Sequence, residues 1–266
     1  MAVLGAASGG GHLPQLAISN SMTWVPPIDG NVCIHVIGGG GGGSGHSSHG
    51  YPGGAGGYCK KNSLAVTTSG SFTIVVGAGG NGGSAAVGSN GGYSTVAGTG
   101  LSATLTANGG YGGGTWTGSG YWGFGGSASN GDVNNTGGNG GNANGGNGGA
   151  VGVYGTGANG CNEYGRHGDT TDAQGEGLGQ SGYGYIVGGA GQAGSWVSGD
   201  RAYVAHMPSG ALTGGAGCYV ASGYMNSSAG SGGIGGGGGG AANNGYVAYA
   251  NGGDGGDGIV LIQYLP

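Results

Sequence analysis

The sequence predicts a mainly β protein that joins a small antiparallel β-sandwich to a glycine-rich bundle of polyglycine II helices, with almost no α-helix. Three observations predict this fold class. Glycine supplies 83 of the 266 residues, short strand-like segments recur along the chain, and the glycine tracts show a three-residue repeat. No segment has the sustained period and the caps of an amphipathic helix.

The composition favours an ordered chain in spite of its glycine content. Collagen is excluded because there are only 6 prolines and no strict G-X-Y repeat. Disordered chains are usually rich in charge and poor in aromatics, whereas here 5% of residues are charged and there are 15 Tyr and 4 Trp. Fixing each backbone unit costs about 1–2 kcal/mol, and glycine has no side chain to bury. We therefore expect dense backbone hydrogen bonding between closely packed chains.

Six segments are typical of β-strands. Residues 31–37 (NVCIHVI) run directly into six glycines at 38–43. Residues 61–67 and 71–76 are expected to pair as a hairpin across Ser69 and Gly70, and residues 93–97 and 101–107 as a second hairpin. Residues 258–265 (GIVLIQYL) form the closing strand. The predicted organisation is a separate N-terminal attachment segment at 1–30, a β-rich part at 31–107, and the bundle with its closing strand at 108–266.

The glycine tracts have the period of polyglycine II. Residues 137–149 read GGNGGNANGGNGG, and a chain of the polyproline II type has three residues per turn with a rise of about 3.1 Å. Side chains then occupy one face in three, and the bare faces let neighbouring helices approach. Residues 38–43 and 235–240 are bare on all faces and are expected at the centre of the bundle. The alternative is that these tracts are flexible linkers.

Charge and chemistry exclude several classes of function. Four basic residues (Lys60, Lys61, Arg166 and Arg201) against nine acidic ones are too few for a nucleic-acid interface. No apolar run approaches the roughly 20 residues of a membrane span, and the first 16 residues lack the pattern of a signal peptide, so we expect folding in the cytosol. The four cysteines form no CxxC pair and are expected to be buried and reduced.

No catalytic motif is present, and we expect the protein not to be an enzyme. The sequence contains no GxSxG, HExxH or Walker lysine pattern. Three weaker patterns could bear chemistry: a metal pair at His46 and His49, a calcium pair at Asp254 and Asp257, and carboxylates for glycoside hydrolysis at Glu163, Asp169 and Asp172. None has a supporting spacing or array, so no metal and no cofactor is expected.

The order of elements resembles the glycine-rich domain of bacteriophage tail fibres and related virion proteins, over about residues 24–266. The resemblance is carried by Trp24-Val25-Pro26, by the strand 32–37 entering the glycines 38–43, by 71–80, by GGYST at 91–95, by LTANGG at 105–110, and above all by GGDGGDGIVLIQY at 252–264. The start MAVLG is similar to the opening of T-even-type tail-fibre tip adhesins. The strand-then-glycine pattern is also similar to the extracellular glycine-rich region of some animal receptor kinases.

This resemblance implies receptor binding by the non-glycine insertions. In the tip adhesins a rigid scaffold of polyglycine II helices holds loops that contact the host outer membrane. Tyr, Trp and Arg dominate binding hot spots, and they concentrate in the matching insertions here. The candidate receptor-binding residues are Trp116, Tyr121, Trp122, Phe124, Tyr164, Arg166, His167, Tyr185, Trp196, Arg201 and Tyr203. The alternative is that these aromatic side chains cap the bundle and bury its sides.

The same resemblance implies a location in the virion tail fibre after assembly in the host cytoplasm. The expected partners are other tail-fibre or virion proteins, bound through residues 1–30, and a host receptor that is an outer-membrane protein or a glycan, with a homotrimer as one candidate assembly. A purely structural virion component, either a fibre shaft segment or a capsid decoration, is the main alternative. An ice-binding or matrix protein is a third, which the irregular aromatic insertions disfavour.

Overall fold

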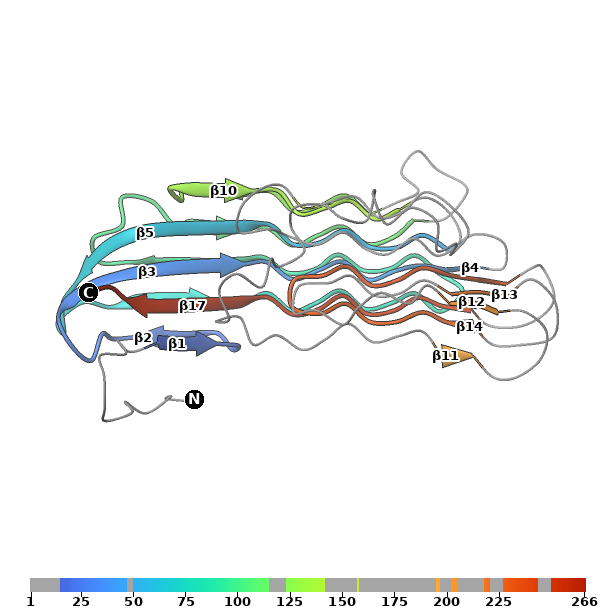
Figure 1. Ribbon diagram of the computed structural model, residues 1–266, viewed down its shortest axis with the longest axis horizontal. Coiled ribbons are helices and arrows are strands. Elements are labelled where there is room, and N and C mark those ends of the chain that lie inside the picture. Colours follow the sequence, from blue (N-terminus) through green and yellow to red (C-terminus); the bar gives the residue numbers. More distant parts are fainter. Residues whose placement is uncertain are drawn as a thin grey trace.

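The computed structural model describes residues 15–46, 50–114, 123–141, 157, 227–243 and 250–266, together with three short strands at 195–196, 202–204 and 218–220. The described part is elongated, with strands gathered at one end and wavy extended tracts running away from them (Figure 1). The predicted mainly β class with an antiparallel sandwich is confirmed: the described residues form strands and extended segments, and none of them is in an α-helix.

Two five-stranded antiparallel sheets form the first part of the molecule. The first sheet has the order β1 (Gln15–Ile18), β17 (Ile259–Tyr264), β3 (Gly30–Ile37), β5 (Tyr58–Val66) and β10 (Val133–Asn135). The second has the order β2 (Met22–Trp24), β6 (Phe72–Val75), β7 (Ser94–Gly98), β8 (Leu105–Ala107) and β9 (Ala128–Ser129). The expected closing strand 258–265 is β17, which lies inside the first sheet between β1 and β3.

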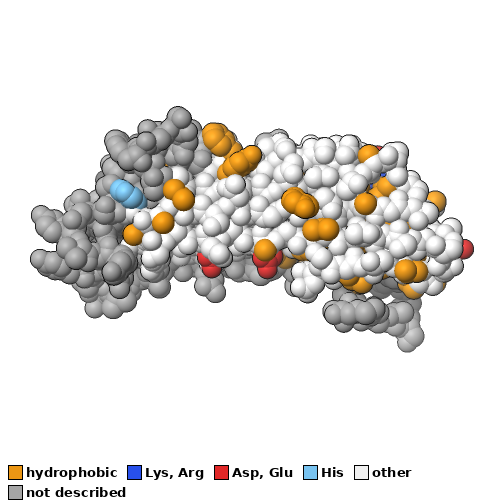
Figure 2. All heavy atoms as spheres, turned by 180° about the vertical axis from the view of Figure 1, so that it is seen from behind, with side chains coloured by type: hydrophobic (Ala, Val, Ile, Leu, Met, Phe, Trp, Pro, Cys, Tyr) orange, Lys and Arg blue, Asp and Glu red, His pale blue; other side chains and the backbone are white. Residues whose placement is uncertain are grey.

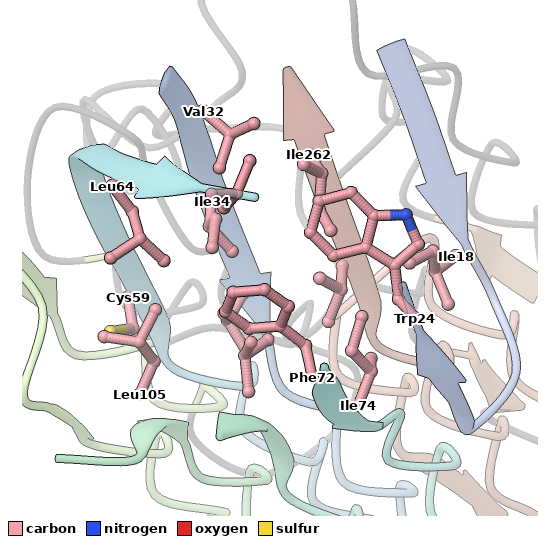
Figure 3. Close-up of a cluster of buried hydrophobic side chains, with 14 of the residues drawn as sticks. Ile18, Trp24, Val32, Ile34, Cys59, Leu64, Phe72, Ile74, Leu105 and Ile262 are labelled. Atoms are coloured by element: carbon pink, nitrogen blue, oxygen red, sulfur yellow. The ribbon is translucent and has the colours of Figure 1, made fainter. Parts of the chain in front are cut away.

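One apolar core lies between the two sheets, as a sandwich requires. Alternate residues of β3 and β5 face alternate residues of β6, β7 and β8 across it (Figure 3). Trp24 and Phe72 pack with ring centroids 5.3 Å apart. The side chains labelled in Figure 3 are Ile18, Trp24, Val32, Ile34, Cys59, Leu64, Phe72, Ile74, Leu105 and Ile262, and all are buried.

One of the two expected hairpins is wrong. The segments 61–67 and 71–76 correspond to β5 and β6, which lie in different sheets, so the chain crosses from one sheet to the other between them. The physical reason is that both strands carry apolar residues on alternate positions, Leu64 and Val66 on one and Phe72 and Ile74 on the other. These residues bury each other face to face across the core. The second hairpin is confirmed, because β7 pairs with β8.

Each strand of the two large sheets except β1 and β2 is directly preceded or followed by a glycine tract (Figure 1). Residues 38–45 follow β3, and three successive amides of this tract donate to three different neighbouring tracts. Gly39, Gly40 and Gly41 donate at 2.8–2.9 Å to the carbonyl oxygens of Gly92, Gly256 and Gly54. The amides of the next three residues donate to the same three tracts, three residues away from the first acceptors. Their acceptors are the carbonyl oxygens of Ser89, Gly253 and Tyr51.

The carbonyl oxygens of the same tract accept from three further tracts. Those of Gly39, Gly40 and Gly41 receive the amides of Gly110, Gly80 and Gly238 at 2.8–2.9 Å. Residues 38–45 are therefore bonded on six sides and fully buried. This three-residue repeat agrees with the period found in the sequence, while the polyglycine II conformation itself stays a prediction.

Burial in the tracts follows the same period. Residues 38–45, 50–57 and 235–241 are buried throughout, so the two all-glycine runs lie at the centre as expected. In the outer tracts 77–83, 87–93, 108–114, 123–127 and 250–258 an exposed residue recurs at every third position. Examples are Ala78 and Asn81 in one tract, and Asp254 and Asp257 in another. The outer tracts thus have a G-G-X pattern in which X faces outward.

The spatial organisation differs from the linear division of the sequence. Residues 15–18 and 22–24, inside the expected attachment segment, supply the edge strands β1 and β2 of the two sheets. The tracts 38–45, 50–57, 77–83 and 87–93 lie in the bundle beside the tracts 108–114, 123–127, 137–141, 229–241 and 250–258. The role of residues 1–30 in attachment stays a prediction.

Candidate functional site

The connections between tracts differ at the two ends of the bundle. At the sandwich end the tracts pass into strands, except at the turn near Gly235, which has a φ of 66°. At the other end, called here the distal end, the tract 108–114 leaves beside Gly42, whose oxygen accepts from Gly113, and the tract 123–127 returns beside Pro52, whose oxygen accepts from Gly123. The chain between Gly114 and Gly123 therefore starts and finishes at the distal end.

Two small sheets join the tracts at this distal end (Figure 1). One has the order β11 (Ser195–Trp196), β14 (Ser227–Ser228) and β16 (Ala250–Asn251). The other has the order β12 (Ala202–Val204), β13 (Cys218–Val220), β15 (Ala241–Asn243) and β4 (Gly45–His46). Since β4 and β15 end central tracts, the backbone of 202–204 is anchored to the scaffold, and the backbone of 195–196 is anchored to it through β14 and β16, which begin the tracts 229–234 and 252–258.

The structure places three of the predicted receptor-binding residues. Trp196 lies in β11 opposite Ser227, and Tyr203 lies in β12 opposite Tyr219, so both are at the distal end. Phe124 lies instead on the side of the bundle, in the tract 123–127, with 49% of its surface exposed. The other predicted residues lie outside the described part of the chain: Trp116, Tyr121, Trp122, Tyr164, Arg166, His167, Tyr185 and Arg201.

Sequence reasoning missed a second group of exposed side chains, on the side of the bundle. Tyr93 and Tyr111 are 59% and 55% exposed, and Val87 is exposed as well. They occupy outward positions of the adjacent tracts 87–93 and 108–114, which are bonded through Gly91 and Gly110. The signal that could have found them is the G-G-X repeat, in which a large X is exposed because its neighbours in the tract are glycines.

Side-chain oxygens at outward positions cap the amides of neighbouring tracts. Asp257 and Asp254 each accept a 2.7 Å hydrogen bond, from Gly79 and Gly82 respectively. Asn90 accepts from Gly112, and Asn139 accepts from Gly125, both at 2.8 Å. The pair of aspartates that could have suggested calcium binding thus serves as acceptors for backbone donors. Among the described residues, no three His, Cys, Asp or Glu side chains gather into a group that could hold a metal ion.

A polar cluster on β3 and β5 has the residue types of a catalytic pair. The ring of His35 shares a 2.7 Å hydrogen bond with the Tyr58 hydroxyl, and its other nitrogen lies 3.3 Å from Cys33 Sγ. Burial lowers the pKa of His35 to about 4 and raises the pKa of the Cys33 thiol. Both groups are therefore neutral near pH 7, which is the opposite of the thiolate and imidazolium that a nucleophilic pair needs.

The surface of the bundle is mostly uncharged. Figure 2 shows apolar side chains as separate groups on a face made chiefly of backbone and uncharged polar side chains. The one ion pair found between described residues joins Lys61 to Asp132 at 2.7 Å, on the sandwich. No helix in the described residues has the length and apolar character needed to cross a membrane.

Comparison with known proteins identifies a family. The family of glycine-rich domains matches residues 17–265, which is nearly the whole chain. No curated protein matches the sequence.

Proposed function

The chain belongs to the family of glycine-rich domains, and we propose that it is a bacteriophage tail-fibre adhesin that binds a host surface receptor through its distal end. The observation that carries the proposal is the placement of the connections. The segment between Gly114 and Gly123, which carries Trp116, Tyr121 and Trp122, leaves and re-enters the scaffold at the end opposite the sandwich, and β11 and β12, with Trp196 and Tyr203, lie at the same end. A rigid rod with recognition segments at one tip suits an adhesin.

The scaffold supports this proposal through its rigidity. We infer that the tracts are polyglycine II helices, because successive amides bond to different neighbours with a period of three. Chain segments held at both ends by such a bundle lose less conformational entropy on binding than free loops do. The residues proposed to contact the receptor are the aromatic and cationic ones between and after the tracts, with Trp122, Arg166 and Trp196 as their representatives.

The opposite end has features that suit attachment to a fibre. β1 and β2 are edge strands, and Val25 and Ile28, in the link from β2 to β3, are 54% and 47% exposed. Exposed apolar side chains beside open strand edges favour contact with another protein. We propose that other virion proteins bind here, and that the protein has no enzymatic activity.

The test is adsorption of phage particles carrying alanine at Trp122, Arg166 and Trp196 together. We expect the particles to assemble normally and to adsorb to host cells at least 10-fold more slowly than particles with the parent protein. A matched control is the variant with alanine at Val25 and Ile28, which we expect to reduce incorporation of the protein into particles instead. Normal adsorption by the triple variant would favour a structural virion component, either a shaft segment or a decoration.

A further inference from the structure

Three adjacent tracts form an outer layer of the bundle. Residues 87–93 and 108–114 are joined by hydrogen bonds from Gly88 and Gly91, and residues 108–114 and 123–127 by the bond from Tyr111 to the carbonyl oxygen of Phe124 at 2.8 Å. Beneath them lie two central tracts: residues 87–93 are bonded to 38–45, residues 123–127 to 50–57, and residues 108–114 to both. The layer is therefore supported from beneath and cannot fold its outward side chains inward.

The outward positions of this layer carry large rings. Tyr93, Tyr111 and Phe124 are each about half exposed, and in each case the adjoining residues within the tract are mostly glycines. The outward positions of the tracts 77–83 and 250–258 carry small or polar residues instead, Ala78, Asn81, Asp254 and Asp257 among them. The same scaffold thus places aromatic side chains on one face and not on its neighbour.

The arrangement of the rings follows from the hydrogen bonds. Tyr111 and Phe124 lie side by side, because the amide of one bonds to the carbonyl of the other. Tyr93 lies two residues beyond Gly91, which is bonded to Gly110. Since the tracts are antiparallel, Tyr93 is displaced from Tyr111 by about three residues, or about 9–10 Å along an extended chain. This separation is on the length scale of a disaccharide.

The chemistry of the layer selects the ligand. The three tracts contain no Asp, Glu, Lys, Arg or His, so a charged ligand has no counter-charge within them. Asn90, Asn108 and Ser127 occupy other exposed positions of the same three tracts. Asn90 uses its oxygen to accept from Gly112, and Asn108 donates to Ser127 at 2.9 Å. The amide group of Asn90 can still donate to a hydroxyl, since each amide nitrogen carries two hydrogens.

We propose that this layer, with Tyr93, Tyr111 and Phe124 as its contacts, binds a neutral glycan chain. The apolar faces of pyranose rings pack on exposed aromatic rings, and sugar hydroxyls bond to the side-chain amides of the same tracts. A protein partner fits less well, because Tyr93 is set apart from Tyr111 and Phe124 and the three rings do not form one continuous apolar patch. The proposal concerns the side of the bundle and does not depend on the segments at its distal end.

The test is titration of the purified protein with maltohexaose, cellohexaose and laminarihexaose, followed by calorimetry and by NMR. We expect saturable binding of at least one of these neutral hexasaccharides, unchanged between low and high salt because no charge is involved. The variant with Tyr111→Asn and Phe124→Asn should bind at least 10-fold more weakly. Asparagine is chosen because Asn81 and Asn90 already occupy outward positions, and circular dichroism should show an unchanged fold.

Two controls separate this site from the others. The variant with alanine at Val25 and Ile28, which removes exposed apolar groups at the other end, should bind the sugar normally. So should the protein with alanine at Trp122, Arg166 and Trp196, whatever its effect on adsorption. Absence of saturable binding to all three sugars, or equal binding by the Tyr111 and Phe124 variant, would overturn the proposal. Self-association in sedimentation that this variant abolishes would identify the layer as a contact between copies instead, and would also overturn it.

Discussion

The carboxylate of Asp257 accepts a 2.7 Å hydrogen bond from the amide of Gly79, although the two residues lie 178 positions apart in the sequence. Asp254 and Gly82 form the same contact one repeat further along. An outer tract lacks a neighbour on its solvent side, so some of its amides have no backbone acceptor. A side-chain oxygen at the outward position of the next tract supplies one.

Replacing Asp257 tests this role. We expect Asp257→Ala to lower the free energy of unfolding by about 1 kcal/mol, the typical contribution of one hydrogen bond. Asp257→Asn removes the same charge but keeps an oxygen that can accept from Gly79, so it should cost less than half as much. Urea unfolding of the two variants measures the difference, and equal losses would show that charge, not hydrogen bonding, explains the effect.

The outward and inward positions of one tract should respond oppositely to substitution. In Gly80→Ala the new methyl group would overlap the carbonyl oxygen of Ser89 and lie 2.8 Å from the amide nitrogen of Gly42. Because both obstacles are backbone, we expect a loss of about 3 kcal/mol or more, at the upper end for overpacking. Asn81→Ala, at the adjacent exposed position, should change stability by less than about 0.5 kcal/mol. Similar melting curves for the two variants would contradict the packing described here.

The buried cysteines should be unreactive in the native protein. Burial raises the pKa of Cys59 to about 11, and its thiol donates to the carbonyl oxygen of Ser129 at 3.3 Å. Since the thiolate is the reactive form, two pKa units reduce its fraction about 100-fold at pH 8. We expect iodoacetamide to label Cys59 at least 100-fold more slowly in the native protein than in denaturant, as measured by mass spectrometry of the peptide. Labelling at the same rate in both would show that the core is open.

The parts of the fold that the sequence predicts best are those in which local pattern and burial agree. The strand 31–37 is rich in β-branched apolar residues and then meets six glycines, and the structure has β3 there, followed by a buried tract. The partner with which a strand pairs is harder to predict from the sequence. Leu64 and Val66 of β5 and Phe72 and Ile74 of β6 are equally compatible with pairing side by side and with packing face to face. The long-range pairing of β5 with β3 and β10 decides between these two arrangements, and no local sequence pattern indicates that pairing.

The grouping of side chains in the candidate site is equally hard to predict from the sequence. Phe124 follows Trp122 by two residues, so a reading along the chain groups them. The structure places Phe124 in the tract 123–127, at an outward position on the side of the bundle, while Trp122 lies outside the described residues. Tyr93 and Tyr111, far apart in sequence from Phe124, join it on the same layer. Neighbourhood in a bundle of tracts is set by hydrogen bonds between tracts, which a single sequence does not reveal.

The polar cluster on β3 makes the stability of the sandwich depend on pH. His35 faces the Tyr58 hydroxyl and Cys33 Sγ, and it lies opposite Lys60 on β5 and Leu261 on β17. Burial, with the repulsion of Lys60, lowers its pKa from 6.5 to about 4. In the unfolded chain the imidazole takes up a proton as the pH falls below about 6.5, but in the folded protein it stays neutral until about pH 4. The unfolded state therefore binds more protons in this window, and the free energy of unfolding falls as the pH falls.

We expect this residue to account for a loss of about 2–3 kcal/mol between pH 7 and pH 4, from 1.36 kcal/mol per pKa unit. The measurement is urea unfolding at intervals of half a pH unit, compared with His35→Gln, which cannot titrate. The variant will be less stable at pH 7, because it loses the contact of the imidazole ring with the Tyr58 hydroxyl. Its free energy of unfolding should nevertheless decline less steeply between pH 6.5 and 4. Other groups that titrate in this range contribute equally to both proteins, so parallel pH profiles would mean that His35 is protonated as readily in the folded protein as in the unfolded one.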